Sequence, residues 1–292
     1  MSIFITPAMV GQVVISGLLA GALYSMVALG LALIFGVMRV INIAHGTILM
    51  LGAYTTFWWF QLLGINPYLS LLASMPLMFL LGLLLQYTMV TRVVDAPELS
   101  SLLLTFGISI ALVNLAQLAF TSDLRSVEFL TGAFVLGPIA LSKSRLVSFT
   151  VAVAITLLAF WFLQKTKLGK AIRATSQNSE VAMICGINVP RIRLYTFGIA
   201  SALAGAGGSL VAVIFAIQPE MGQVYTFKSF LVIILGGAGN YPGALLGGML
   251  LGLVEQLASL FLTTQLSEAV AYVLLVLVLL LRPTGLLGGR AR

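Results

Sequence analysis

The stretch Lys165–Arg193 reads KTKLGKAIRATSQNSEVAMICGINVPRIR, and it is the one long polar and basic segment of the sequence. It carries six cations and a single acid, Glu180, and apolar segments long enough to cross a bilayer flank it on both sides. Positively charged loops of this length stay in the cytoplasm. The stretch therefore predicts the orientation of a membrane protein and offers a short surface to a soluble partner.

The composition agrees with a membrane protein. Hydrophobic residues make up 60% of the chain and charged residues only 8%, whereas about a quarter of the residues of a soluble domain are charged. At roughly 20 residues per crossing, most of the 292 residues are needed for spans and short loops. We expect an all-α, polytopic helical bundle that forms a single transmembrane domain over residues 1–292, with no appended soluble domain.

Apolar runs predict the positions of the spans. One long run is interrupted by GGAGNYPG (236–243), which cannot be continuous helix because of its proline and glycines. This break is interpreted as a turn near a span end or, alternatively, as backbone that lines a cavity. The count is nine crossings, or eight if the first leg of the broken run is re-entrant and the C-terminal tail is not cytoplasmic. The expected segments are Val10–Val37, Ala44–Leu63, Leu69–Val90, Ser100–Phe120, Leu146–Leu163, Leu194–Ile217, the broken run Phe227–Leu262 and Ala269–Leu281.

The distribution of cations sets the rest of the topology. With the basic stretch inside, Arg39 and Arg92 also fall inside, the N-terminus faces out, and the C-terminal tail with Arg282, Arg290 and Arg292 is cytoplasmic. The net charge of +7 thus reflects span ends and not nucleic-acid binding. The one cysteine, Cys185, lies in the loop placed inside, where it stays reduced.

Small residues recur at a spacing that lets helices approach closely in lipid. The pairs are Gly17/Gly21, Gly243/Gly247, Gly248/Gly252 and Ala202/Ala206. Packing within one subunit is the favoured interpretation, and contact with a second membrane subunit is the alternative.

The sequence argues against an enzyme. It has no phosphate-binding loop, no HExxH motif, and one histidine with one cysteine, which is too few for a typical zinc site. We expect no catalytic residue, no metal, and no cofactor bound by this chain.

Polar side chains inside the apolar segments are the candidates for a translocation path or for helix–helix contacts. Glu255, followed by Gln256, is the acid placed well inside a segment, and a buried carboxylate in lipid needs a partner. His45 is expected at the cytoplasmic end of the second segment, and Asn114 and Gln117 share one helical face. The full set is Asn42, His45, Asn114, Gln117, Asn240, Glu255 and Gln256.

The basic stretch has a pattern of its own. Residues Leu168–Ala174 are interpreted as a span that extends into water, and Ser179–Gly186 as a short helix with a glycine stop, followed by Pro190. A short helix across the mouth of a bundle suits docking of a partner; contact with the membrane surface alone is the alternative.

Three stretches carry a resemblance to a known family. Ser16–Tyr54, Arg173–Gly208 and Leu235–Glu255 resemble the LivH type of branched-chain amino acid permease, and together with the rest they extend the likeness over nearly the whole chain. Within the second stretch, Glu180, Val181 and Ala182 followed by Gly186 resemble the EAA---G loop of ABC-importer permeases, with valine in place of the second alanine.

This resemblance implies a multi-subunit importer. Arg173, Glu180, Ala182 and Gly186 would then belong to a loop that couples to two cytoplasmic ATPase subunits, which use the ATP. A second, LivM-like permease subunit and a periplasmic binding protein would complete the system in the bacterial inner membrane. The implied cargo is leucine, isoleucine and valine, moved by alternating access; urea, short amides or other small carboxylates are alternatives. A stand-alone secondary transporter or channel is the competing function.

Overall fold

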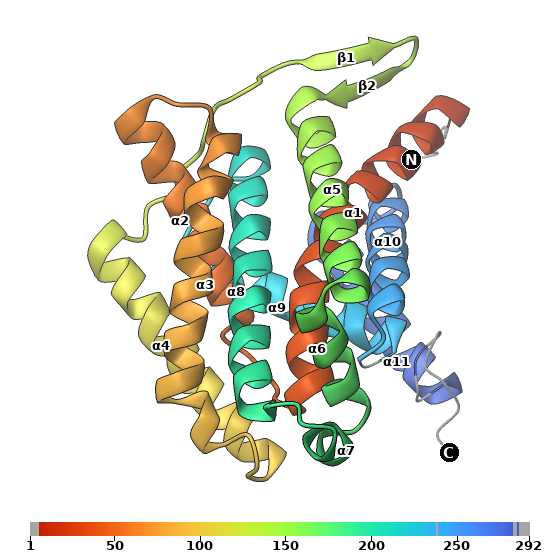
Figure 1. Cartoon of the computed structure of the whole chain (residues 1–292). Coiled ribbons are helices and arrows are strands. Elements are labelled where there is room, and N and C mark those ends of the chain that lie inside the picture. The colour runs from red at the N-terminus through yellow and green to blue at the C-terminus, as the bar shows by residue number, and fades with distance from the viewer. Residues whose placement is uncertain (1–5, 238, 283–284, 286–292) are drawn as a thin grey trace.

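The computed structural model describes residues 6–237, 239–282 and 285, which form a bundle of helices with a small β-hairpin at one end (Figure 1). This confirms the predicted helical, polytopic membrane fold. Most predicted segments match a helix to within a few residues. The helices are α1 (Pro7–Met38), α2 (His45–Leu63), α3 (Leu71–Thr88), α4 (Glu98–Phe120), α5 (Lys143–Lys165), α6 (Lys167–Gln177), α7 (Ser179–Ile184), α8 (Val189–Ile214), α9 (Met221–Gly236), α10 (Tyr241–Ala258) and α11 (Thr264–Leu281), with 3-10 turns at Pro67–Ser70 and Val90–Arg92.

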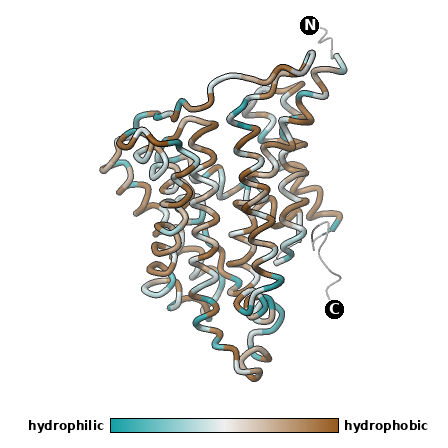
Figure 2. Tube along the Cα trace, turned by 45° about the horizontal axis from the view of Figure 1, so that its top comes forward, coloured by the Kyte–Doolittle hydropathy of each residue, from teal (hydrophilic) through white to brown (hydrophobic). Residues whose placement is uncertain are grey.

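Five helical stretches among the described residues are long and apolar enough to cross a membrane on their own. They are α1, α4, α5, α8, and α3 together with its two flanking 3-10 turns. Apolar residues dominate the length of the helices, and hydrophilic residues gather toward the ends of the bundle (Figure 2). The protein is therefore an integral membrane protein, while the count of eight or nine crossings stays a prediction.

Helices α1 and α8 form the centre of the bundle. In their most apolar stretches 83% and 89% of the residues are buried, against 28% or less in α3, α4 and α5. The outer helices thus show their apolar side chains to lipid, since lipid is as apolar as a leucine-rich core.

Glycines allow α1 and α10 to touch along their backbones. A Cβ added to Gly21 would lie 2.8 Å from the Cα of Met249, and one added to Gly17 would lie 2.9 Å from the carbonyl oxygen of Gly252. Ser25 adds a hydrogen bond from its Oγ to the carbonyl oxygen of Leu245, 2.8 Å away. These small residues therefore serve packing within the subunit, as the sequence favoured.

The chain between α1 and α2, residues 39–44, is irregular and mostly buried. Thr105 on α4 accepts a hydrogen bond from the amide of Ile43 (3.1 Å) and donates one to the carbonyl oxygen of Ile41 (2.8 Å). Thr226 on α9 donates to the carbonyl oxygen of Ile43 (3.2 Å) and accepts from the amide of Gly46 (3.0 Å). Irregular backbone inside a membrane needs such hydrogen-bond partners. These two threonines therefore stabilise the non-helical segment between α1 and α2.

The broken run is two helices, α9 and α10, that meet at an angle of 117°. The side chain of Asn240 caps α10 by accepting from the amide of Gly243 (3.1 Å). The turn packs against the end of α1, since a Cβ on Gly36 would lie 3.4 Å from the Cα of Gly239. This position favours the turn at a span end over the cavity-lining alternative. Ala238, in the middle of the motif, lies outside the described residues.

Two expectations for the loops were wrong. Residues Leu168–Ala174 do not continue the preceding span, because the chain becomes extended at Thr166, whose hydroxyl caps the separate helix α6 by accepting from the amide of Gly169 (3.0 Å). The loop 121–145 contains an antiparallel hairpin, β1 (Ala133–Leu136) and β2 (Ile139–Ser142), where no strand was expected.

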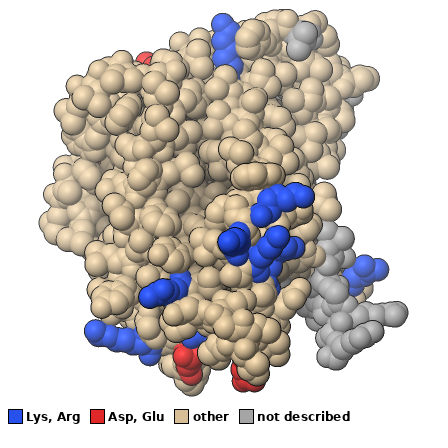
Figure 3. All heavy atoms as spheres, viewed as in Figure 1, with Lys and Arg blue, Asp and Glu red and all other residues tan. Residues whose placement is uncertain are grey.

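The charges are distributed unevenly between the two ends of the bundle. Lys and Arg gather over the end that carries α6 and α7, and the hairpin lies at the opposite end (Figures 1 and 3). This asymmetry agrees with the expected orientation. Arg290 and Arg292 of the tail lie outside the described residues.

Candidate coupling site and polar groups in the membrane

Helix α7 is fixed at both ends by its own sequence. The side chain of Asn178 accepts hydrogen bonds from the amides of Glu180 and Val181, both at 3.0 Å. At the other end Gly186 adopts φ +82°, and the amide of Ile187 donates to the carbonyl oxygen of Ala182 (3.0 Å). An asparagine N-cap and a left-handed glycine are the usual signals for these positions, which confirms the predicted short helix and its stop.

One face of α7 is apolar and exposed although the helix lies outside the spans. Ile184 is 85% exposed, and Val181 and Met183 are each 52% exposed. Ala182 faces the opposite way and is buried, which anchors α7 to the bundle. Apolar side chains exposed together at the end of a bundle mark an interaction site.

Helix α6 connects this surface to the spans. Ile172 is fully buried, and Gly169 lies so close to Phe162 and Leu163 of α5 that a Cβ there would collide with backbone. Arg173 is exposed on the other side of α6. Helix α6 thus links α7 to α5 through a tight contact.

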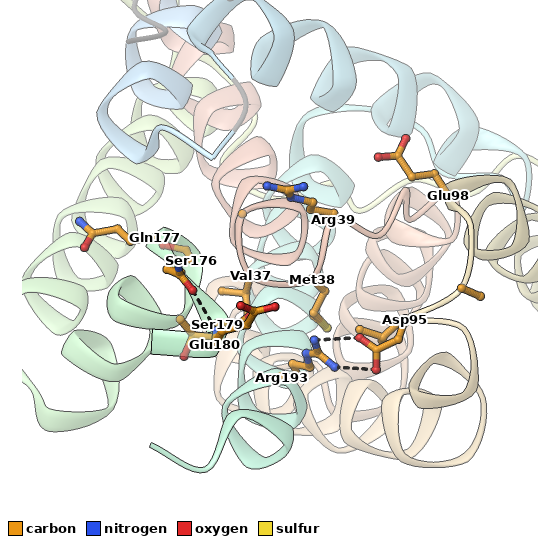
Figure 4. Close-up of a pocket in the computed structure, with 15 residues that line it drawn as sticks. Val37, Met38, Arg39, Asp95, Glu98, Ser176, Gln177, Ser179, Glu180 and Arg193 are labelled. Carbon is orange, nitrogen blue, oxygen red and sulfur yellow. Dashed lines mark hydrogen bonds and ion pairs between the residues drawn. The ribbon is translucent and has the colours of Figure 1, made fainter. Parts of the chain in front are cut away.

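A cleft of 510 Å³ lies beside α7 at the same end of the bundle. The end of α1, the loop before α4, the α6–α7 junction and the start of α8 line it (Figure 4). Arg193 of α8 holds Asp95 of that loop with two hydrogen bonds of 3.1 and 3.2 Å. The cleft also presents Arg39, Glu98 and Glu180, so it offers both signs of charge to a partner.

Of the predicted coupling residues, Glu180, Ala182 and Gly186 come together in and after α7, with Glu180 at the cleft. Arg173 lies one helix earlier and does not line the cleft.

An ionic network lies inside the membrane-spanning part. The Nζ of Lys228 on α9 is 2.6 Å from Oε1 of Glu255 on α10 and 3.3 Å from Oε1 of Glu268 on α11, and it also donates to the hydroxyl of Tyr24 on α1 (3.1 Å). Lys228 and Glu255 are each 8% exposed. The network therefore ties four helices together with one more acid than base.

Sequence reasoning singled out Glu255 but missed Lys228. The signal was present, because Lys228 is a lone cation within the apolar run Phe227–Leu262. An intramembrane acid and an intramembrane base within one run predict a pair.

His45 begins α2, at the end of the segment where it was predicted, but it lies deeper in the bundle than a residue at the cytoplasmic surface. Its Nε2 donates to the carbonyl oxygen of Val27 (2.9 Å), and Val27 lies about 16 Å along α1 from Met38 at about 1.5 Å per residue. The irregular residues 39–44 carry the chain inward before α2 begins, and the imidazole is fully buried.

The remaining candidates are not brought together. Asn42 is fully buried, and neither atom of its amide has a partner among the described residues. Asn114 and Gln117 lie on α4, where Gln117 donates to Glu220 (3.4 Å). Asn240 caps α10, and Gln256 borders a small cavity beside Tyr24. Their role as path or contact residues stays a prediction.

Comparison with known proteins agrees with this architecture. Residues 13–279 match the family described as branched-chain amino acid transport system / permease component. The chain is 30% identical to the high-affinity branched-chain amino acid transport system permease protein LivH of Escherichia coli K12 and 32% identical to the corresponding protein BraD of Pseudomonas aeruginosa, with 95% of each chain covered in both cases. The ribose import permease RbsC of Escherichia coli is 31% identical over only 35% of this chain.

No solved structure matches the protein. The match over nearly all of its length, on a bundle of membrane-spanning helices, shows that the chain belongs to the family of permease components of branched-chain amino acid transport systems.

Proposed function

We propose that this chain is the permease subunit of an ABC importer that carries branched-chain amino acids across the bacterial inner membrane. The names of its full-length relatives support the cargo. The observation that carries the coupling role is the exposed apolar face of α7, formed by Val181, Met183 and Ile184, on a helix fixed by Asn178 and Gly186. Cytoplasmic ATPase subunits bind this face and use the ATP, and the chain itself performs no hydrolysis.

The contacts around α7 suggest how movement of the ATPases reaches the spans. Helix α7 packs on α6, α6 packs on α5, and the chain continues from α7 into the central helix α8. The Arg193–Asp95 pair joins the start of α8 to the loop before α4. Displacement of α7 therefore moves α5, α8 and α4 together, which is what alternating access requires.

The other partners follow from the same proposal. A second, LivM-like permease subunit completes the path through the membrane, and a periplasmic binding protein delivers the amino acid at the hairpin end. In this arrangement the end that carries α6 and α7 faces the cytoplasm, as the concentration of Lys and Arg there supports.

The test places a charge on the exposed face of α7. Ile184→Asp puts a desolvated carboxylate into the ATPase contact, so we expect loss of ATPase co-purification and of leucine uptake while the permease still reaches the membrane. Leu124→Asp is the matched control, because Leu124 is also exposed (70%) but belongs to the chain between α4 and β1. Equal ATPase binding by both variants would contradict the coupling role.

A second measurement separates the proposal from a transporter that acts alone. Leucine uptake into liposomes should require the ATPases, ATP and the binding protein in addition to this chain. ATP-independent uptake by the purified chain would favour a secondary transporter or channel.

A further inference from the structure

A cavity of 170 Å³ lies between α4 and α9, on the face of α9 away from the Lys228 network. Its apolar part is formed by Phe106, Ile110 and Val113 of α4, Phe227 of α9 and Ile43 of the segment between α1 and α2. Asn114 and Gln223 contribute amide groups to its lining.

The cavity lies at mid-depth along the bundle and opens to its surface, since Phe106, Ile110 and Phe227 are 44%, 48% and 52% exposed. Ile43 is held by Thr226, which also binds the amide of Gly46 at the start of α2. The first turns of α2 and α9 meet there, since a Cβ on Gly222 would collide with the backbone of Gly46. Because α2 begins at the depth of Val27 in α1, both helices start well inside the membrane-spanning part.

Polar side chains at this depth need an explanation. Asn114 and Gln223 are exposed on the surface of the subunit, yet polar groups in a span almost always face protein or a water-filled path and not lipid. Asn114 uses its Nδ2 on the carbonyl oxygen of Ile110 (2.8 Å), which leaves its carbonyl oxygen as an acceptor. Gln223 offers a donor and an acceptor, since its side chain makes no hydrogen bond within the described part of the chain.

We propose that this cavity holds the amino acid during its passage through the permease, an inference that rests on the proposed function. The aliphatic side chain occupies the apolar part, and the α-amino and carboxylate groups bind the amides of Asn114 and Gln223. No ionised side chain lines the cavity. It therefore suits an amino acid with an uncharged side chain and disfavours lysine or glutamate, whose side-chain charge would lie against the apolar lining without a partner.

The test changes the size of the cavity in the complete, ATP-driven transporter. Ile110→Trp fills the cavity and should abolish leucine uptake without loss of ATPase binding. Leu118→Trp is the matched control, because Leu118 lies on α4, is 84% exposed and does not line the cavity. Phe106→Ala enlarges the cavity and should raise phenylalanine uptake relative to valine uptake by about tenfold, since one methylene in an apolar pocket already changes discrimination by about 10-fold or more.

The outcomes separate this inference from the proposed function. If the wild-type transporter moves no branched-chain amino acid, the proposed function is wrong. If it moves leucine but Ile110→Trp and Leu118→Trp behave alike, or Phe106→Ala leaves selectivity unchanged, only the binding cavity is wrong. Loss of the second permease subunit from the Ile110→Trp complex would show instead that the cavity is a subunit contact.

Discussion

The three charges inside the membrane-spanning part are not equivalent. Lys228 contacts both Glu255 and Glu268, so its removal leaves two carboxylates without their shared cation. Removal of the Glu255 charge still leaves Lys228 paired with Glu268. We expect Lys228→Met to cost about 3–5 kcal/mol, the usual penalty for an uncompensated buried charge, and Glu255→Gln to cost clearly less, as measured by thermal unfolding in detergent.

The double variant Lys228→Met/Glu255→Gln serves as the control for this ordering. It removes one charge of each sign, so it should unfold at a higher temperature than Lys228→Met alone. A Glu255→Gln variant less stable than Lys228→Met would show that Glu268 does not balance the lysine.

Gly186 ends α7 in a conformation that other residues avoid. Its φ is +82°, and no atom lies within 4 Å of an added Cβ, so a side chain meets backbone strain and no steric overlap. Gly186→Ala should cost about 1–2 kcal/mol and weaken ATPase binding, because the strain is relieved by distorting α7. Gly186→Asn should be milder, since asparagine tolerates this conformation.

Gly107→Ala is the matched control for Gly186→Ala. Gly107 also has free space around it but belongs to a regular stretch of α4, where alanine is preferred over glycine. Co-purification with the ATPase should be unchanged in this control. Equal ATPase binding by Gly186→Ala would mean that the glycine has no part in coupling.

The conformation or position of a single residue was predicted well where neighbouring residues in the sequence determine it, and poorly where distant residues do. The glycine stop at Gly186 follows from a few neighbouring residues. The depth of His45 follows from the segment before it, whose backbone is held by hydrogen bonds from Thr105 and Thr226, far away in the sequence. Nothing in the residues around His45 announces those partners.

At the scale of elements, the contact between α1 and α10 depends on glycine. Gly21→Ala places a Cβ 2.8 Å from the Cα of Met249, where backbone must move. Overpacking of this kind costs about 1–3 kcal/mol, so we expect a clear loss of thermal stability in detergent. Gly64→Ala would add strain of its own at φ +64°, so Gly107→Ala is again the better control. Equal stability of the two variants would show that α1 and α10 can separate without cost.

The positions of the long helices could be predicted from hydropathy alone, because a run of about twenty apolar residues indicates a helix that crosses the bilayer. The same signal failed at Thr166. The apolar run of α5 ends at Lys165, and whether the chain continues straight or turns depends on the hydroxyl of Thr166 and on contact between Gly169 and Leu163. The hairpin of β1 and β2 was missed because its strands, AFVL and IALS, are apolar runs of only four residues, too short to show a strand period.

The orientation of the whole molecule is tested most directly through Cys185. It is the single cysteine of the chain, it is exposed, and it follows α7 immediately. The concentration of Lys and Arg at this end predicts that it faces the cytoplasm. A membrane-impermeant maleimide should therefore leave intact cells or spheroplasts unlabelled and should label Cys185 in inside-out vesicles. Bound ATPase subunits should lower that labelling, because Cys185 is next to the exposed residue Ile184.

A Cys185→Ser variant measures the background labelling. A cysteine introduced at Leu124 in that variant is the reporter for the opposite end, which should react in intact spheroplasts. Labelling of Cys185 from outside would reverse the bundle, and α7 could then not meet a cytoplasmic ATPase.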